Sequence, residues 1–125
     1  MKKSNNKIWK HLPPALDVGW AKFSFILKKN LKDEEDSKCY GITDFNKLTI
    51  TLEENMSESE AHHTIIHECC HAFMETFGLG GPEEGHPDKV ESSNEVVTES
   101  ACRCFLLFRN LNYPLWKVLF EDYYE

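Results

Sequence analysis

The sequence predicts an α+β fold in which a small antiparallel sheet of two to four strands packs on a pair of longer helices, with a short helix at the C-terminus. Two patterns support this class: apolar and polar residues alternate in short segments before residue 53, and apolar residues recur at helical spacing after residue 57. The chain has 125 residues, which is enough for one hydrophobic core and too few for two. We therefore expect a single domain over residues 1–125.

The strands are expected in the first half of the chain. Residues 1–14 are polar and end in two prolines, so we expect a loosely ordered N-terminus. Residues 18–27 alternate aromatic and polar side chains, a pattern typical of a strand. Residues 39–42 and 47–52 flank the turn-prone tetrad 43–46, and this arrangement predicts a β-hairpin.

The helices are expected in the second half. Ser57 followed by Glu60 forms a capping box, and the helix that it begins ends at a glycine-rich segment after about residue 77. A second helix is predicted from residue 88 or 92 to about residue 110. Pro114 suits the first turn of a short third helix.

Charge and hydropathy limit the partners. The net charge is −7; residues 1–32 contain eight lysines and one aspartate, whereas residues 33–125 contain six basic and twenty acidic residues. The acidic body argues against nucleic-acid binding, and the N-terminal lysines are best interpreted as a solvated strand face rather than a surface for an acidic partner. The sequence lacks an apolar run as long as a membrane span, and its first ten residues lack the apolar stretch that is typical of a signal peptide. We expect a cytoplasmic protein that does not bind membranes; its oligomeric state is left open.

The cysteines follow no disulfide framework. Cys39, Cys69, Cys70, Cys102 and Cys104 are odd in number and irregularly spaced, so free and mostly buried thiols are predicted. The Cys102-x-Cys104 pair is a poor candidate for a metal site because residues two apart on a helix point to different sides.

The functional signal is the pentapeptide His67-Glu68-Cys69-Cys70-His71, which lies in the middle of the first long helix. Residues four apart share a helical face, so His67 and His71 can bind one metal ion. Glu68 is offset around the helix and can reach a metal-bound water as a general base. His63 also lies four residues before His67 and offers an alternative pair, but only the pair His67 and His71 encloses a glutamate in the general-base position.

A catalytic zinc ion needs a third protein ligand. Glu95 and Glu99 share one face of the second long helix; Glu95 is the preferred ligand, and Glu99 would then accept the free ring N–H of a ligating histidine. Ser92-x-x-Glu95 also reads as a capping box, in which Glu95 would only close the helix start. His86 is the rival third ligand, and Glu99 is a further one.

These motifs support a family resemblance. Residues 39–44, the segment Thr64 to Ala72 around the pentapeptide, and Asn94-Glu95-Val96-Val97 together resemble the small zinc metallopeptidases of phages and mobile elements that are related to the ImmA/IrrE class. The acidic segment at residues 94–99 is also similar to the second motif of gluzincins, which implies that Glu95 is a ligand. The Glu-Gly-His loop at His86 is similar to SprT-type proteases, the second choice. The resemblance implies a zincin-type helical pair.

The expected activity is that of a zinc metallopeptidase, in which zinc-activated water attacks a peptide bond and Glu68 acts as general base. The edge of the 47–52 strand is expected to hold the extended peptide or protein substrate by backbone pairing. The alternative function is a non-catalytic, zinc-stabilised binding or regulatory module, in which a fourth protein ligand such as His86 or His63 would close the metal site. The substrate sequence is not readable from the chain.

Overall fold

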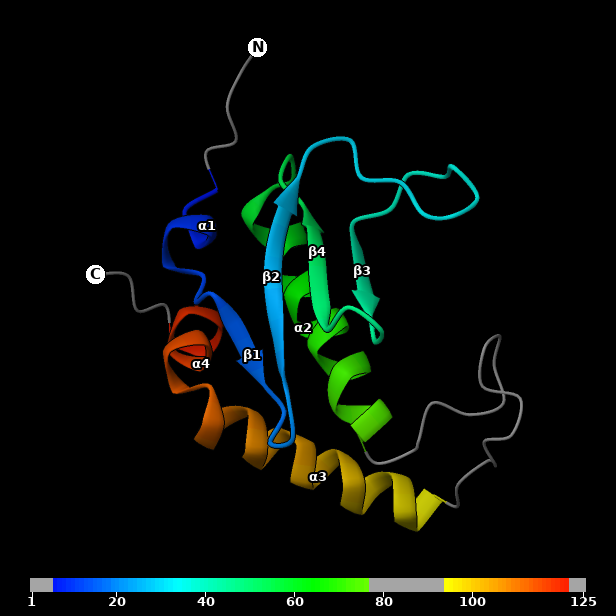
Figure 1. Ribbon diagram of the computed structural model, residues 1–125. Helices are drawn as coiled ribbons and strands as arrows, with labels where there is room; N and C mark the ends of the chain where they lie inside the picture. The colour runs from blue at the N-terminus through cyan, green and yellow to red at the C-terminus, as the bar shows by residue number, and fades with distance from the viewer. Residues whose placement is uncertain (1–5, 77–93, 122–125) are drawn as a thin grey trace.

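The computed structural model describes residues 6–76 and 94–121. The described residues form a mixed four-stranded sheet and four helices, and the α+β class is confirmed (Figure 1). The elements follow one another as α1 (Ile8–His11), β1 (Ala15–Asp17), β2 (Lys22–Lys28), β3 (Gly41–Asp44), β4 (Thr49–Glu53), α2 (Glu58–Thr76), α3 (Asn94–Leu111) and α4 (Tyr113–Phe120).

The strand order in the sheet is β1-β2-β4-β3. The hairpin expected from residues 39–52 is formed by β3 and β4, which pair antiparallel. β4 also pairs with β2, and this pairing is parallel, so the expectation of a purely antiparallel sheet is wrong at this one junction. The long connection between β2 and β3 allows the chain to cross over before the hairpin forms, as a parallel pair requires.

The strand that was expected at the edge of the sheet lies in its centre. The strand predicted at residues 47–52 is β4, which is paired on both sides and whose side chains Ile50 and Leu52 are fully buried. Two packed neighbours and an apolar face place β4 in the centre of the sheet. The strand at the edge beside it is β3, so the backbone groups available for a peptide belong to residues 41–44.

The strand expected at residues 18–27 is shorter in the structure. β1 and β2 form an antiparallel hairpin, and residues 18–21 are its turn, in which Gly19 has a φ of 99°. This left-handed conformation suits glycine and interrupts the strand. Trp20 therefore lies exposed in the turn, whereas Phe23 on β2 is buried in the core.

Residues 6–14 differ from the loose order expected for residues 1–14. The Asn6 side-chain amide donates a hydrogen bond to the main-chain oxygen of Ser57 at 3.3 Å, and its side-chain oxygen accepts one from the Ile8 N–H at 3.0 Å. The Ile8 side chain is buried in the core. This packing over the beginning of α2 explains why a polar segment is ordered.

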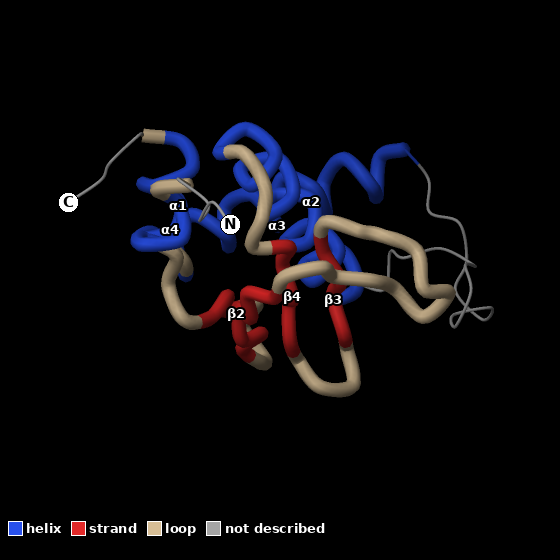
Figure 2. The backbone as a smooth tube through the Cα atoms, turned by 90° about the horizontal axis from the view of Figure 1, so that it is seen from above, coloured by secondary structure: helices blue, strands red, loops and turns tan. Residues whose placement is uncertain are grey.

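The helix that carries the pentapeptide begins as predicted. The Ser57 side-chain oxygen accepts a hydrogen bond from the Glu60 N–H at 3.1 Å, which confirms the N-cap. The helices lie on one side of the sheet (Figure 2). α2 contacts β3 and β4, and its buried residues are Ala61, Thr64, Ile65, Glu68, Cys69, Ala72 and Phe73.

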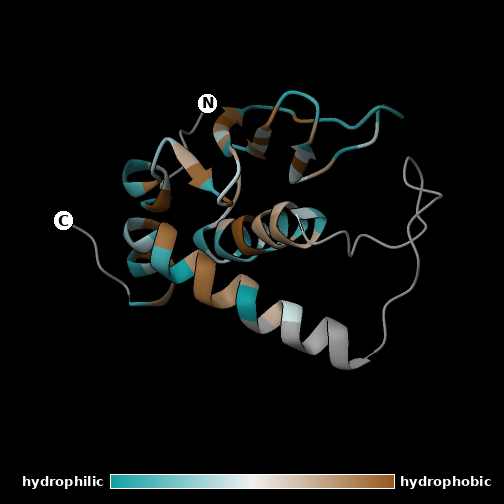
Figure 3. Ribbon diagram, turned by 60° about the horizontal axis from the view of Figure 1, so that its bottom comes forward, coloured by the Kyte–Doolittle hydropathy of each residue, from teal (hydrophilic) through white to brown (hydrophobic). Residues whose placement is uncertain are grey.

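The last two helices contact each other, and Leu115, Val118 and Leu119 of α4 are buried in the core. Pro114 lies in the first turn of α4, as predicted, and α3 contacts both α2 and α4. Hydrophobic and hydrophilic residues alternate along the visible side of α3 (Figure 3), and Phe105 is 56% exposed. Phe108 fills the core from α3, whereas Phe120 at the end of α4 is 42% exposed. Within the described ranges, none of the helices is both long and apolar enough to cross a membrane.

Candidate metal centre

The two histidines of the pentapeptide are brought together by the pitch of α2. The Nε2 atoms of His67 and His71 lie 3.1 Å apart, and both side chains are exposed to solvent. Two nitrogens that each lie about 2.0–2.1 Å from a tetrahedral zinc ion would be about 3.3 Å apart. The observed separation is close to this value, so the pair can chelate a zinc ion with only a small adjustment of the rings.

Glu68 lies between these histidines in sequence but faces the sheet. Its side chain is only 7% exposed, and the hydroxyl of Thr43 on β3 donates a hydrogen bond to Glu68 Oε1 at 2.7 Å. One ligand atom from each of His67, Glu68 and His71 lies within 4.8 Å of the others, and this is the group of possible metal ligands within the described residues. A buried carboxylate needs such partners because desolvation of its charge is costly.

The close approach of β3 to α2 depends on Gly41. A Cβ atom at this position would lie 2.8 Å from Cγ of Glu68 and 3.0 Å from Cγ2 of Thr64. Contacts this short require displacement of the neighbour, so a side chain at residue 41 would separate the edge strand from the helix. The absence of a side chain therefore lets the Thr43 hydroxyl reach Glu68.

The other histidines of α2 have different surroundings. The His63 and His67 ring centroids are 6.2 Å apart, compared with 4.7 Å for His67 and His71. This difference favours the second pair as the chelate. The His62 ring is hydrogen-bonded to the main-chain oxygen of Leu119 and lies edge-on to Phe120, contacts that link α2 to α4.

The structure does not decide between Glu95, Glu99 and His86 as the third metal ligand. Glu95 and Glu99 lie on the α3 backbone, four residues apart, but their side chains are outside the part of the chain that the structure describes. His86 lies outside the described residues altogether. The contact between α2 and α3 brings the helix of Glu95 and Glu99 against the helix of the two histidines, and the choice of Glu95 stays a prediction.

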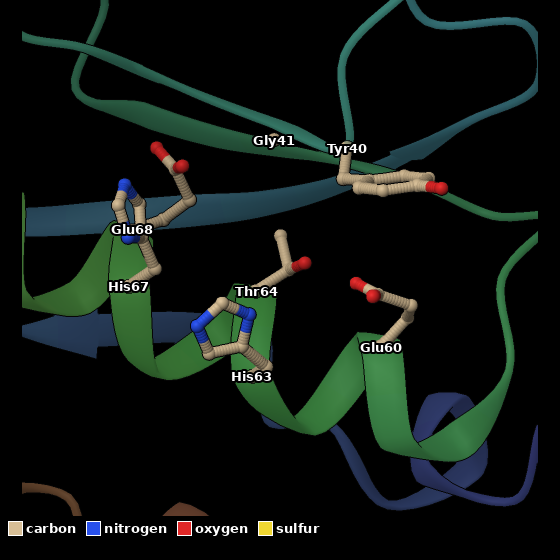
Figure 4. A pocket seen from close by; sticks show the side chains of 7 residues that line it. All are labelled: Tyr40, Gly41, Glu60, His63, Thr64, His67 and Glu68. Atoms are coloured by element: carbon tan, nitrogen blue, oxygen red, sulfur yellow. The ribbon is translucent and has the colours of Figure 1, made fainter.

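A cavity of about 370 Å³ lies alongside Glu68 and His67, toward the beginning of α2 (Figure 4). Its lining residues come from α2 and from the start of β3: Tyr40, Gly41, Glu60, His63, Thr64, His67 and Glu68. Because Glu68 and His67 form part of its wall, a molecule that occupies this cavity touches the candidate metal site.

The thiols near the site are free but not mostly buried. Of the four cysteines whose side chains are described, only Cys69 is buried, whereas Cys70 is exposed. Burial raises the pKa of the Cys69 thiol well above its ordinary value, and burial raises the pKa of Cys104 to about 11. A high pKa disfavours the thiolate, the nucleophilic form of a cysteine.

Two parts of this site were not recognised from the sequence. Thr43 and Glu68 are 25 residues apart and meet only through packing of the sheet on the helix, which leaves no pattern in the sequence. Glu60 was identified only as part of the capping box. Its place four residues before Thr64 on a helix was the available signal that it shares the face of the site.

Comparisons of this chain with protein-family models, with curated proteins and with solved structures find no match. The resemblance to the ImmA/IrrE class therefore stays a prediction.

Proposed function

We propose that this protein is a zinc-dependent metallopeptidase in which His67 and His71 hold the metal ion and Glu68 is the general base. The observation that supports this proposal is the 3.1 Å separation of the two Nε2 atoms beside a buried glutamate held by a threonine hydroxyl. On this proposal the chain is a relative of the ImmA/IrrE metallopeptidases.

The residues suit zinc better than they suit a hard cation. Imidazole nitrogens are preferred zinc ligands, whereas calcium and magnesium prefer oxygen. When bound, a zinc ion supplies a Lewis acid that polarises a carbonyl group and lowers the pKa of water. Both histidines are exposed, and this exposure favours a site with an open position over a closed structural site.

Glu68 would move the proton. Its carboxylate is within reach of both histidine rings, and the Thr43 hydroxyl occupies one of its oxygens. The other oxygen can accept a proton from an attacking water and pass it to the leaving amine. Because the Thr43 bond restrains the side chain, the carboxylate would not need to reorganise during the reaction.

The free edge of β3 is the proposed place for the substrate. Among the described residues β3 pairs only with β4, so its outer N–H and C=O groups can pair with an extended peptide. This edge runs along α2, with Gly41 over Glu68. A peptide paired with β3 would therefore lie across the general base and the two histidines.

Replacement of the general base tests the mechanism. We expect Glu68→Gln to keep bound zinc and to reduce peptide hydrolysis by about 10²–10⁴-fold, because glutamine cannot accept the proton. Zinc content is measured by elemental analysis of the purified protein, and hydrolysis with a quenched fluorescent peptide library. A Glu68→Gln protein as active as the wild type would exclude this role of Glu68.

Replacement of the candidate third ligands tests the metal set. We expect Glu95→Ala to lower zinc occupancy more than His86→Ala, because loss of a ligand weakens binding more than loss of a neighbouring side chain. Titration of each variant with a chelator of known affinity gives the comparison. The reverse order would transfer the ligand role to His86, and a fourth protein ligand seen by X-ray absorption would favour the zinc-stabilised binding module instead.

A further inference from the structure

The cavity beside Glu68 has a chemical character that the metal site does not require. Its wall away from the histidine pair combines an aromatic ring from Tyr40, the carboxylate of Glu60 and the imidazole of His63. Figure 4 shows the Glu60 side chain rising from α2 toward the side of the cavity where Tyr40 lies. An aromatic ring and a carboxylate on one side of a cavity are the groups that bind an organic cation.

Both groups are available to a ligand. Tyr40 is 53% exposed. Within the described part of the chain the Glu60 carboxylate forms no ion pair, and the Glu60 hydrogen bond to Ser57 uses its main-chain N–H. The helix cap therefore does not occupy the carboxylate.

The remaining wall favours a long side chain with a charged end. Gly41 contributes no side chain, and the buried Thr64 presents its methyl group toward Gly41. The methylene groups of lysine or arginine can contact this narrow part of the wall while the charged group reaches Glu60. An acidic side chain would be repelled by Glu60 and Glu68, and a purely apolar one would desolvate Glu60 without compensation.

The direction of the sheet edge indicates which residue of a peptide would enter. β3 and α2 advance in the same direction, because Tyr40 lies near Glu60 whereas Thr43 lies near Glu68. A peptide paired antiparallel with β3 would run from the His71 end of α2 toward Glu60. Residues that follow the scissile bond would therefore reach the cavity.

We propose that the cavity bounded by Tyr40, Glu60 and His63 is a subsite for a lysine or arginine side chain on the C-terminal side of the scissile bond. This inference rests on the proposed peptidase function for the position of the scissile bond. The selectivity for a cationic side chain rests only on the cavity itself, so it can be tested without catalysis.

The first experiment measures binding. The wild-type protein is titrated with N-acetyl-arginine methylamide and, in parallel, with N-acetyl-norleucine methylamide, and amide chemical shifts are followed by NMR. The arginine compound should shift the amide resonances of residues 40–41 and 60–64. The Glu60→Gln substitution should lower the affinity for this compound about fivefold, as expected for a partly exposed ion pair. Equal shifts with the norleucine compound, or an unchanged affinity in Glu60→Gln, would overturn the proposal.

A matched variant controls for the helix. Glu58 lies with Glu60 in the first turn of α2 but does not line the cavity. Glu58→Gln removes the same charge from the helix N-terminus, so it should leave the arginine affinity unchanged. A loss equal to that of Glu60→Gln would assign the effect to the helix end and contradict the subsite.

The second experiment measures specificity. Cleavage products of a randomised peptide mixture are sequenced after treatment with the wild type and with Glu60→Lys. The wild type should enrich lysine and arginine after the cleaved bond, and Glu60→Lys should enrich aspartate and glutamate there. If the wild type cleaves nothing, the peptidase proposal fails while the NMR titration still decides the cation site; cleavage without a preference at that position would contradict the subsite alone.

Discussion

The two helices that carry the candidate ligands are held in different ways. α2 lies against the sheet, and its core residue Phe73 is 1% exposed. α3 contacts α2 and α4; among its described side chains Phe108 is buried, whereas Phe105 and Leu106 are exposed. The helix packed on the sheet thus carries His67, Glu68 and His71, whereas Glu95 belongs to α3.

This difference indicates how the site is organised. Side chains on well-packed elements keep their geometry before a metal ion binds, and the short separation of the two Nε2 atoms agrees with this. A ligand on α3 would join the site from a second helix, across the contact between α2 and α3. We therefore expect the two histidines to set the position of the metal ion and the third ligand to add affinity.

The largest expected effect concerns the histidine pair. We expect His71→Ala to weaken zinc binding by about three orders of magnitude or more, because the remaining ligands lose the chelate. His63→Ala is the matched change on the same helical face and should leave the zinc affinity within about twofold. Competition with a chromogenic chelator measures both variants, and a large loss in His63→Ala would identify His63 and His67 as the metal pair.

A second pair of variants tests the packing difference between the helices. We expect Phe73→Ala to lower the free energy of unfolding by about 3–5 kcal/mol, because it opens a cavity in the core. Phe105→Ala should change it by less than about 1 kcal/mol, since that side chain is mostly exposed. Urea unfolding followed by circular dichroism gives both values. Similar losses in the two variants would mean that α3 is supported as firmly as α2.

The sequence was sufficient for the hairpin of β3 and β4 and for the long helices, but not for α1, β1 or the arrangement of the strands. Local signals predicted the start of α2 at Ser57, the start of α4 at Pro114 and the hairpin around residues 43–46. In this hairpin, Asp44 Oδ1 accepts hydrogen bonds from the main-chain N–H groups of Asn46 and Lys47. These signals act within a few residues of the chain. The parallel pairing of β2 with β4 depends on contacts between distant segments, and no local pattern specifies it.

The candidate site divides in the same way. The helical repeat predicted that His67 and His71 share a face, and the structure brings their rings together. The support for Glu68 comes from Thr43 on another element, and the resemblance included this residue without assigning it a role. The sequence therefore predicts which residues share one face of a helix, but it does not predict which residue of the sheet contacts that face.

The smallest expected effect concerns the contact between Gly41 of β3 and Glu68 of α2. Gly41→Ala would place a Cβ atom 2.8 Å from Cγ of Glu68, so either the glutamate or the strand must move. We expect peptide hydrolysis to fall about tenfold, because a displacement of the general base by a few tenths of an ångström weakens its alignment. Zinc affinity should stay within about twofold, since the histidines lie on the exposed face of α2.

The control for this variant separates alignment from general loss of strand stability. Thr51→Ala changes β4 at the position paired with Ile42, next to Gly41 but away from Glu68, and should leave hydrolysis nearly unchanged. Equal losses in the two variants would attribute the effect to the sheet as a whole. A selective loss in Gly41→Ala would mean that the edge strand, by its close approach to α2, positions the general base while the histidine pair is set by the helix alone.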